Sequence, residues 1–599
     1  MTMSTKDFYL TILYGSETGT AQDTAEGIWK SAKRFGLKCS VMAMDDYNIE
    51  NLISERLIVF VVATTGQGEV PTNMRKFWRM LLRKSLPNYI LGGLTFAVLG
   101  LGDSSYDKYN YAARKLQKRI LQLGGTELIP LGLADDQDAL GIDETIDPWT
   151  KDLWSKISIE FDLLLKRNSN NDSELIERFD VSILRNVGDN EIQETLKFPR
   201  DIYREELEIN DQLKVAKLID NSRITSEDHF QDVRLIKLGV QNVDYEPGDV
   251  IYIRPKNSPE QVKDFFNILT EHEIPLYPDT ILKINEKEII LPHVLKKPIT
   301  LEQLAEQYWD LSYKPRRSTM KILASISDNN IEREKFIEFT TTEGQEDLYN
   351  YINRPRRNIL ELLHDFPHTT KKLNEKILFE LMMPIKPRAF SIASSNKYSP
   401  NEVHLLVAIV EYKTIIVKPR IGLCSNWLKS LEINDEILFT IQKGTFRFDY
   451  TKPMILIGPG TGLAAFRSML LERAALKHDL HDTVLFFGCR NKEKDFHCRK
   501  NLENLVKENN LKLFCAFSRD QTNKIYVQNI IHQQQELCWD LLTKGGKIYL
   551  SGSSKNMPKA VKEEFIEIAK TFGNLDDNNA VEFVKKLEAT GRYQTETWS

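Results

Sequence analysis

An apolar strand followed at once by a loop of glycines and hydroxyl residues, and then by a helical pattern, occurs at both ends of this chain. Near the N-terminus the expected strand 8–14 leads into Gly15 and the sequence Ser-Glu-Thr-Gly-Thr-Ala, and near the C-terminus strand 454–458 leads into Pro-Gly-Thr-Gly. Strands of this kind form parallel sheets covered by helices on both faces, because a parallel neighbour is reached only through a long crossover. The sequence therefore predicts an α/β domain at each end.

The rest of the chain fits a multidomain α/β and β fold. Further strands are expected at 57–63, 95–99 and 127–131 in the first block and at 483–488, 512–517 and 547–551 in the last. The middle block has β-rich segments around 232–240, 249–254 and 403–410, and between them a mostly helical stretch, with Thr300 as an N-cap for a helix over 301–311. The expected domains are 1–165, a polar linker 166–194, a β-barrel domain 195–450 with a helical insertion at about 258–381, and 451–599.

The composition of the chain disfavours several classes of function. The 599 residues carry a net charge of −5 and no basic stripe, which disfavours nucleic-acid binding. The six cysteines form no C-x-x-C pair, so neither a disulfide framework nor a metal site is expected. No apolar run approaches the ~20 residues of a membrane helix, and no signal peptide is expected.

Three loops at strand ends of the first block suit a phosphate and a flat ring. The first offers a glycine, hydroxyls and a helix N-terminus, which together favour a terminal phosphate. The others follow strands 57–63 and 95–99, and open sheets bind ligands at the carboxyl ends of their strands. A plain turn with an N-cap is the alternative for any one loop; three loops on one edge favour binding. The candidates are Ser16, Glu17, Thr18, Gly19, Thr20, Ala21, Ala63, Thr64, Thr65, Gly66, Leu101, Gly102, Asp103, Ser104, Ser105, Tyr106, Asp107, Lys108, Tyr109 and Asn110.

The middle block has a pattern suited to a flavin dinucleotide. In Arg388-Ala389-Phe390-Ser391 the arginine can pair with a pyrophosphate, the aromatic can stack on a ring and the serine can bond the edge of the ring. The run Gly422-Leu423-Cys424-Ser425 is a further helix start suited to phosphate. Upstream, Arg356 is the first and Arg357 the second candidate in a basic cluster whose alternative is a solvated charge run.

The last block has a nicotinamide pattern. The glycines around Thr461 allow close approach of a pyrophosphate to the helix that follows. One loop away, cations and hydroxyls meet the needs of the 2′-phosphate of NADPH, whereas NADH sites favour an acidic residue. These candidates are Ser518, Arg519, Lys524, Ile525, Tyr526, Val527 and Gln528.

The motifs together resemble known families. Residues 8–155 resemble a flavodoxin-type FMN domain, which implies that residues 16–21 bind the phosphate, that 63–66 and 101–110 surround the ring with Tyr106 stacked on it, and that Asp136 contributes from the last loop. The middle and last blocks resemble the FAD and NADPH domains of the ferredoxin–NADP reductase superfamily. The helical insertion resembles the connecting domain of diflavin reductases such as cytochrome P450 reductase.

The resemblance also implies a hydride-transfer site. Ser391, Ser551 and Glu596 are expected to form its polar network, and the penultimate Trp598 to cover the FAD ring. Relatives often carry Cys-Gly-Asp where this chain has Ser551-Gly552-Ser553, and Asp where it has Glu596. Activity is expected to be kept despite these departures.

Over nearly its whole length the chain resembles the NADPH-dependent diflavin oxidoreductases of cytosolic iron–sulfur protein assembly. The segments IKPRAFSIASS, RPRRNILELLHDFPHT and GRYQTETW carry this resemblance. It implies electron flow from NADPH through FAD and FMN to an anamorsin-type iron–sulfur protein, in the cytoplasm and also in association with mitochondria. A soluble P450 reductase-like enzyme, a sulfite reductase flavoprotein subunit and a non-enzymatic scaffold are the alternatives.

Overall fold

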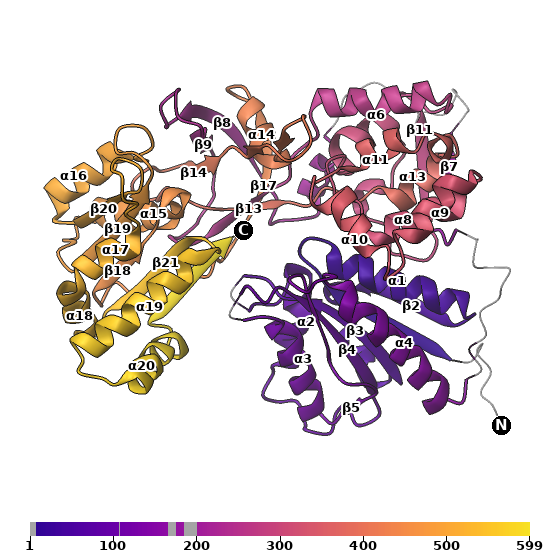
Figure 1. Ribbon diagram of the computed structural model, residues 1–599, viewed down its shortest axis with the longest axis horizontal. Coiled ribbons are helices and arrows are strands. Elements are labelled where there is room, and N and C mark those ends of the chain that lie inside the picture. The colour runs from indigo at the N-terminus through magenta and orange to yellow at the C-terminus, as the bar shows by residue number, and fades with distance from the viewer. Residues whose placement is uncertain are drawn as a thin grey trace. The chain divides into compact units, whose positions relative to one another are not determined.

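The chain forms two compact units in the computed structural model, which describes residues 8–66, 68–106, 108–163, 165, 175–184 and 201–598. Unit 1 comprises Met1–Ile202, Asn257–Lys386 and Thr414–Val417, and unit 2 comprises Tyr203–Lys256, Pro387–Lys413 and Lys418–Ser599 (Figure 1). In this division the helical insertion is grouped with the N-terminal α/β part, and the barrel is grouped with the C-terminal α/β part.

A parallel sheet forms the centre of the N-terminal part of unit 1. Its strands run in the order β2-β1-β3-β4-β5, and β6 also pairs with β4. Every residue of β3 except the last is buried, as expected for a strand covered on both faces. The strands are β1 (Tyr9–Gly15), β2 (Lys38–Ala43), β3 (Leu57–Ala63), β4 (Thr95–Gly102), β5 (Thr126–Glu127) and β6 (Gly132–Asp135).

Helices cover both faces of this sheet (Figure 1). α1 (Thr20–Arg34) and α4 (Asp143–Glu160) pack into one apolar core, and α2 (Arg75–Leu81) and α3 (Tyr111–Gln122) pack into the other. The prediction of an α/β domain here is confirmed.

The prediction of one continuous strand over 127–131 is wrong. Pro130 lies between β5 and β6, and proline cannot donate the hydrogen bond that a central strand requires. The chain therefore pairs briefly with β4 through β5, leaves the sheet, and returns as β6 beside residues Leu99–Gly102 of β4.

The linker expected at 166–194 contains a strand. β7 (Phe179–Ile183) pairs antiparallel with β11 (Ile281–Glu286), which also pairs with β12 (Ile299–Thr300). Phe179 and Val181 are buried, so this segment contributes to a core rather than acting as a spacer. Residues 166–174 and 185–194 of the expected linker lie outside the described residues.

The insertion is mostly helical, as predicted. Thr300 accepts the predicted N-cap bond from the backbone N–H of Gln303 at 3.2 Å. The helix expected over 301–311 is shorter, however: α7 (Leu301–Gln303) continues as the π-helical turn η6 (Leu304–Tyr308) and ends before Trp309, which bridges to Pro384. The other helices are α6 (Pro259–Glu271), α8 (Arg317–Ile326), α9 (Asn330–Glu338), α10 (Gln345–Leu348), α11 (Ile359–Asp365), α12 (Pro367–Thr370) and α13 (Glu375–Leu381).

Unit 2 begins with an antiparallel sheet in the order β13-β10-β17-β8-β9-β14. A bridge between Ile392 and Leu405 joins the two outer strands, so the sheet closes as the predicted barrel does. The strands are β8 (Lys214–Arg223), β9 (Val233–Gly239), β10 (Val250–Ile253), β13 (Arg388–Ser391), β14 (Glu402–Ala408) and β17 (Glu436–Gln442), and α14 (Leu423–Ser430) packs against them.

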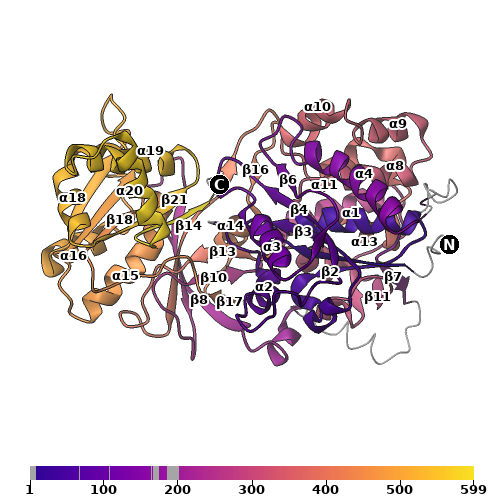
Figure 2. The same ribbon diagram turned by 90° about the horizontal axis from the view of Figure 1, so that it is seen from below.

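A second parallel sheet completes unit 2, in the order β20-β19-β18-β21-β22. α15 (Leu463–Ala475) and α16 (Arg499–Asn509) cover one face, and helices α17 to α20 cover the other (Figure 2). The strands are β18 (Met454–Ile457), β19 (Thr483–Cys489), β20 (Lys512–Phe517), β21 (Lys547–Ser553) and β22 (Tyr593–Trp598), and the other helices are α17 (Val527–Gln533), α18 (Gln535–Thr543), α19 (Asn556–Thr571) and α20 (Asp577–Ala589).

Among the described helices, none is both long enough and apolar enough to cross a membrane.

Candidate cofactor sites

The first predicted phosphate loop joins β1 to α1 at the carboxyl edge of the sheet. Gly19 adopts φ 91, a conformation that favours glycine, and its N–H donates to the hydroxyl of Ser16 at 3.0 Å. The N–H of Ser16 donates in turn to Asn73 Oδ1 at 2.8 Å. The loop is thus held open in front of the N-terminal N–H groups of α1, an arrangement that fits a phosphate.

Glu17 differs from its neighbours in the loop. Its carboxylate accepts bonds from the backbone N–H of Thr72 at 2.8 Å and from the Thr72 hydroxyl at 2.9 Å. The side chain therefore ties the loop to the segment after β3 instead of facing an anion. Thr72 and Asn73 were not among the predicted residues, because only their position in space connects them with residues 16–21.

Hydrogen bonds connect the two loops that are predicted to surround the flavin ring, those after β3 and β4. The N–H of Thr64 donates to the carbonyl of Leu101 at 3.1 Å, and the Thr64 hydroxyl accepts from the N–H of Ala112 at 3.2 Å. In the last loop, the N–H of Asp136 donates to the carbonyl of Gly102 at 2.9 Å. The loops after β1, β3, β4 and β6 therefore lie on one edge of the sheet, as expected for a ligand site of this fold.

Asp135, which was not predicted, shapes the ring loop after β4. Its Oδ1 accepts from the N–H groups of Ser104 at 2.8 Å and Gln137 at 3.0 Å. Burial acts to raise the pKa of Asp135, but these hydrogen bonds outweigh it, so the pKa lies below its usual range. A carboxylate four residues after the predicted strand 127–131 was the only sequence signal for this role.

The aromatic residues of the same loop have different surroundings. The hydroxyl of Tyr109 donates to the carbonyl of Leu133 at 2.6 Å, and burial raises the pKa of this tyrosine. Tyr106 is half-buried, which suits a ring-stacking residue. Asp107, also predicted here, lies outside the described residues.

Asn110 carries a polar atom that fits a ligand. The residue is fully buried with φ 53, and its Nδ2 donates to the carbonyl of Ala134 at 2.9 Å. Its Oδ1 is buried and has no partner among the described residues. Such an acceptor at the ligand edge suits the N–H groups of a flavin.

In unit 2 the first FAD motif forms β13. Arg388 and Phe390 are half-buried, and Phe390 packs against the core of the barrel. The second motif begins α14, with Gly422 as N-cap. Burial raises the pKa of Cys424 to about 12, opposed by the charge of Arg388, so the two predicted motifs lie close enough to interact. The raised pKa makes Cys424 a packing residue rather than a nucleophile.

The two upstream arginines belong to unit 1. Arg356 is exposed and adopts φ 58. Arg357 donates to Asp365 at 2.8 Å and stacks over the ring of Tyr351 at 4.5 Å. The guanidinium of Arg357 thus serves the fold of the insertion, and Arg356 has the more accessible charge.

The nicotinamide loop joins β18 to α15 by way of the turn η8 (Gly460–Gly462). A Cβ at Gly462 would lie 2.2 Å from the carbonyl oxygen of Ser551, so the loop passes too close to β21 for any side chain. Gly460 adopts φ 60, and Thr461 is half-buried between the two glycines. The cradle that they leave fits a pyrophosphate at a helix start.

The residues predicted for the 2′-phosphate follow β20. Ser518 is buried and its N–H donates to the carbonyl of Cys489 at 3.0 Å, whereas Arg519, Lys524 and Tyr526 are exposed. Ile525 and Gln528 are half-buried, and Val527, buried, is the first residue of α17. These two solvent-facing cations follow β20, two strands away from β18 and its pyrophosphate loop, and they fit a phosphate monoester.

The predicted hydride-transfer residues come together in unit 2. The hydroxyl of Ser391 donates to Glu596 Oε1 at 2.7 Å. Glu596 lies opposite Ser551 in the parallel pairing of β21 with β22, and the buried Ser551 hydroxyl has no partner among the described residues. Trp598 lies opposite Ser553 and is 40% exposed, which leaves ring surface that a flavin can cover.

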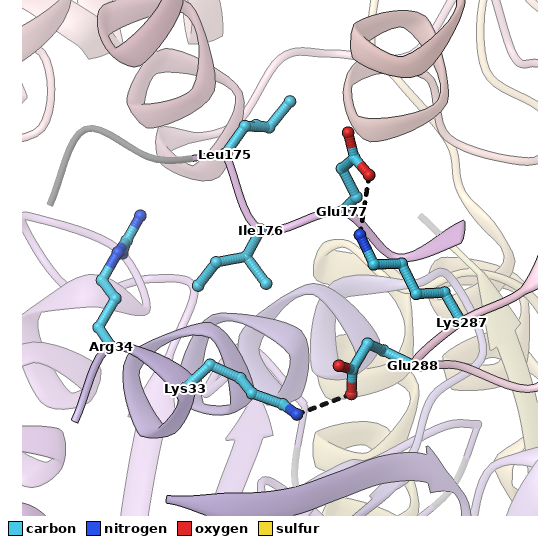
Figure 3. Close-up of a pocket in the computed structure, with 7 residues that line it drawn as sticks. All are labelled: Lys33, Arg34, Leu175, Ile176, Glu177, Lys287 and Glu288. Carbon is cyan, nitrogen blue, oxygen red and sulfur yellow. Dashed lines mark hydrogen bonds and ion pairs between the residues drawn. The ribbon is translucent and has the colours of Figure 1, made fainter. Parts of the chain in front are cut away.

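A pocket of about 230 Å³ lies elsewhere in unit 1 (Figure 3). It adjoins the last turn of α1, the helix end opposite the phosphate loop. Two ion pairs border it: Lys33 with Glu288 at 2.7 Å, and Lys287 with Glu177 at 2.9 Å. Four of the five charged side chains that line it are thus paired with each other. Within the described ranges, no cluster of His, Cys, Asp and Glu side chains could hold a metal ion.

Three family models match the chain in the order of its parts: flavodoxin at residues 12–149, FAD binding domain at 209–427, and oxidoreductase NAD-binding domain at 456–563. Each match covers one of the sites described above. A flavodoxin-like FMN domain joined to an FAD domain and a nicotinamide domain defines the class of diflavin reductases.

The chain belongs to the NADPH-dependent diflavin oxidoreductases. It is 42% identical over 601 residues to NADPH-dependent diflavin oxidoreductase 1 of Xenopus laevis, an alignment that covers 98% of this chain and 99% of the relative. The protein of that name from Debaryomyces hansenii is 38% identical, with 98% of each chain covered, and that from Arabidopsis thaliana is 35% identical, with both chains covered in full. The predictions of an NADPH-dependent enzyme with FMN and FAD as cofactors are confirmed, which sets aside the non-enzymatic scaffold. The roles of the individual residues stay predictions.

Proposed function

We propose that this enzyme passes electrons from NADPH through FAD to FMN, and from FMN to an anamorsin-type iron–sulfur protein in cytosolic iron–sulfur cluster assembly. It acts in the cytoplasm, with a fraction associated with mitochondria. The observation that carries the proposal is the similarity to diflavin oxidoreductases over nearly the full length of the chain, including the three sequence segments by which it resembles those of iron–sulfur assembly.

The order of the carriers follows from their chemistry. NADPH gives up two electrons as a hydride, whereas a flavin can take both and release them singly. The polar network of Ser391 and Glu596 lies near the nicotinamide loop and is the part of this chain suited to position a flavin for hydride transfer. The flavodoxin-like part is then the side that delivers single electrons.

The acceptor is tested by direct reduction. The full-length enzyme, loaded with both flavins and supplied with NADPH, is mixed with a purified anamorsin-type protein carrying an oxidised cluster, and loss of the visible absorbance of the cluster is followed. We expect reduction that saturates with acceptor concentration. A P450 and the haem-bearing subunit of sulfite reductase are tested in parallel, and faster reduction of either would overturn the proposal.

The Thr18→Asp variant tests the last step of the route. A carboxylate in the loop after β1 would repel a phosphate, so FMN should be lost while FAD is retained. We expect the variant to continue to oxidise NADPH with ferricyanide as the electron acceptor. Its reduction of the iron–sulfur protein should stop. Thr24→Asp, one turn after the first residue of α1, is the matched control. A Thr18→Asp protein that kept FMN would contradict the assignment of this loop.

A further inference from the structure

The loop predicted to hold the FMN phosphate contains no cation. Residues 16–21 read Ser-Glu-Thr-Gly-Thr-Ala, so the one charge in the loop is the carboxylate of Glu17. A phosphate monoester carries a charge of about −1.5 to −2 at neutral pH. The N-terminus of α1 supplies a partial positive charge, so any fully charged cation at this site would come from outside the loop.

Arg316 of the helical insertion contacts this loop directly. Its guanidinium donates to the carbonyl of Gly19 at 2.9 Å and to the hydroxyl of Thr20 at 3.3 Å, and it lies 3.8 Å from the carboxylate of Asp23 in the first turn of α1. Arg316 is the residue before α8, and its own N–H donates to Thr319 at 3.2 Å. The charge is therefore fixed beside the loop by a helix that is almost 300 residues away in sequence.

A second cation, Lys386, which follows the insertion in unit 1, approaches the same point. The position of a Cβ on Gly19 would lie 3.8 Å from Cε of Lys386 and 4.0 Å from a terminal nitrogen of Arg316. The ammonium of Lys386 donates to Gln22 in the first turn of α1 at 3.3 Å. Two positive side chains, one from the insertion and one from the segment just after it, thus border a loop that has none.

The neighbouring residue anchors this arrangement. Arg317 pairs with Asp147 at 2.8 Å and with Asp143 at 3.2 Å, both on α4. Arg316 and Arg317 therefore contact two different helices of the flavodoxin-like part, α1 and α4. This double attachment holds the start of α8 at the edge of the phosphate loop.

We propose that Arg316 is a binding residue for the FMN phosphate, supplied by the helical insertion rather than by the flavodoxin-like part. A guanidinium has five donors, so Arg316 can keep its bond to the Gly19 carbonyl while another N–H reaches a phosphate oxygen. The proposal rests on the assignment of residues 16–21 to the phosphate. It adds a positive charge to that site from a part of the chain that the flavodoxin family model, at residues 12–149, does not include.

A thermodynamic consequence follows. Because one residue contacts both the insertion and the phosphate site, FMN binding and the docking of the insertion stabilise each other by the same factor. A chain that has lost FMN should hold its insertion less tightly, and a chain with a weakened attachment should lose FMN more easily.

The test distinguishes a contact with the FMN phosphate from a contact with the flavin ring. Full-length protein freed of FMN is titrated by equilibrium dialysis with FMN and, separately, with riboflavin, which has the same ring and no phosphate. We expect Arg316→Gln to weaken FMN binding about tenfold, the loss of one charge-assisted hydrogen bond at a partly exposed site, and to leave riboflavin binding within about twofold. Arg333→Gln, on the exposed side of α9, is the matched control and should change neither.

Other outcomes would overturn the proposal. Equal weakening of FMN and riboflavin would mean that Arg316 only shapes the loop, and unchanged binding of both would mean that it does not reach the phosphate. Arg316→Lys keeps the charge and should keep most of the preference for FMN; a loss as large as that of Arg316→Gln would also count against a charge effect. Thr18→Asp tests the loop independently: if that variant loses FMN while Arg316→Gln does not, the loop assignment stands and the role of Arg316 falls.

Discussion

At the scale of single residues, the hydride-transfer site depends on two side chains that lie 205 positions apart in sequence. Ser391 ends β13 of the barrel, and Glu596 belongs to the last strand of the nicotinamide sheet. The pairing of β21 with β22 adds Ser551, whose buried hydroxyl has no partner among the described residues. Ser551 therefore offers a hydrogen-bond donor at this point.

Replacing Ser391 by alanine should slow hydride transfer without abolishing NADPH binding. The change removes the 2.7 Å bond to Glu596 and one donor at the edge of the flavin ring, and loss of one such donor costs about 100-fold in rate. The measurement is the rate at which NADPH bleaches the flavin absorbance in a stopped-flow instrument, with NADPH affinity measured separately. Ser430→Ala, at the exposed end of α14, is the control, and a Ser391→Ala rate equal to it would exclude Ser391 from the reaction.

The preference for NADPH should depend on Arg519 and Lys524. Both are exposed one loop away from the predicted pyrophosphate cradle, a position that suits the extra phosphate of NADPH. We expect the double change to alanine to weaken NADPH binding about 100-fold, about tenfold for each charge-assisted bond, and NADH binding by less than threefold. Lys507→Ala, exposed on α16, serves as control. Equal losses for the two nucleotides would refute a phosphate-binding role.

At the scale of the elements, glycines set how closely the nicotinamide loop approaches the sheet. Gly462 and Gly460 lie in the same turn for different reasons. At Gly462 a Cβ would overlap the carbonyl of Ser551, whereas at Gly460 nothing lies within 4 Å and only the φ of 60 favours glycine. One glycine is required by packing and the other by backbone conformation.

These two glycines should respond differently to alanine. Gly460→Ala should lower the free energy of unfolding of the nicotinamide domain by about 1 kcal/mol, the cost of a left-handed residue with a side chain. Gly462→Ala should cost about 3 kcal/mol, because the 2.2 Å approach forces the loop away from β21. Both free energies of unfolding are measured by chemical denaturation, monitored through the hydrogen exchange of the backbone amides of β18 and β21. Equal costs would show that the loop can move freely.

Strongly apolar elements could be predicted from the sequence, and polar or broken ones could not. Strands 57–63 and 512–517 have the predicted bounds, because their apolar runs are continuous. β22 reads Tyr-Gln-Thr-Glu-Thr-Trp, a polar alternation at a sheet edge, and β7 lies in a segment whose composition is typical of a linker. In both, pairing with a distant strand overrides the local pattern.

The candidate sites show the same division. Loops at strand ends could be predicted because glycine and hydroxyl residues mark them, and Ser391 and Glu596 because the family resemblance named them. Asp135, Thr72 and Asn73 could not, because each acts through hydrogen bonds to a loop that is distant in sequence. Arg316 belongs to the same group: its role is set by the position of α8, which no local pattern encodes.

At the scale of the whole molecule, a buried group of charges unites three distant segments of unit 1. Arg178 precedes β7 and lies 3.4 Å from Glu26 of α1 and 3.4 Å from Glu380 of α13. Glu380 also accepts from the N–H of Arg178 at 2.6 Å and from Lys30 at 3.0 Å. Its side chain is 1% exposed, so its charge is compensated almost entirely by these partners. The flavodoxin-like part and the insertion are therefore joined by a network in which each member depends on the others.

Replacing Glu380 by glutamine should destabilise unit 1 by about 3 kcal/mol at pH 7, because Arg178 would keep its buried charge and lose one partner. Burial acts to raise the pKa of Glu380, but Arg178 and Lys30 outweigh it, and the pKa in the folded protein lies below the ordinary 4.5. A carboxylate of lowered pKa stabilises the fold above its unfolded pKa, and that stabilisation is lost as the pH falls through the folded value. The difference in unfolding free energy between wild type and Glu380→Gln should thus be constant from about pH 8 to pH 5 and narrow below about pH 4.5.

This difference is measured by urea unfolding, with the release of FMN fluorescence as the signal for unit 1. The control is Glu288→Gln, since Glu288 pairs with Lys33 at 2.7 Å beside the pocket of Figure 3 and is 32% exposed, for which a cost below about 1 kcal/mol is expected. Equal costs for the two variants would show that burial of the Glu380 network contributes nothing to the attachment of the insertion.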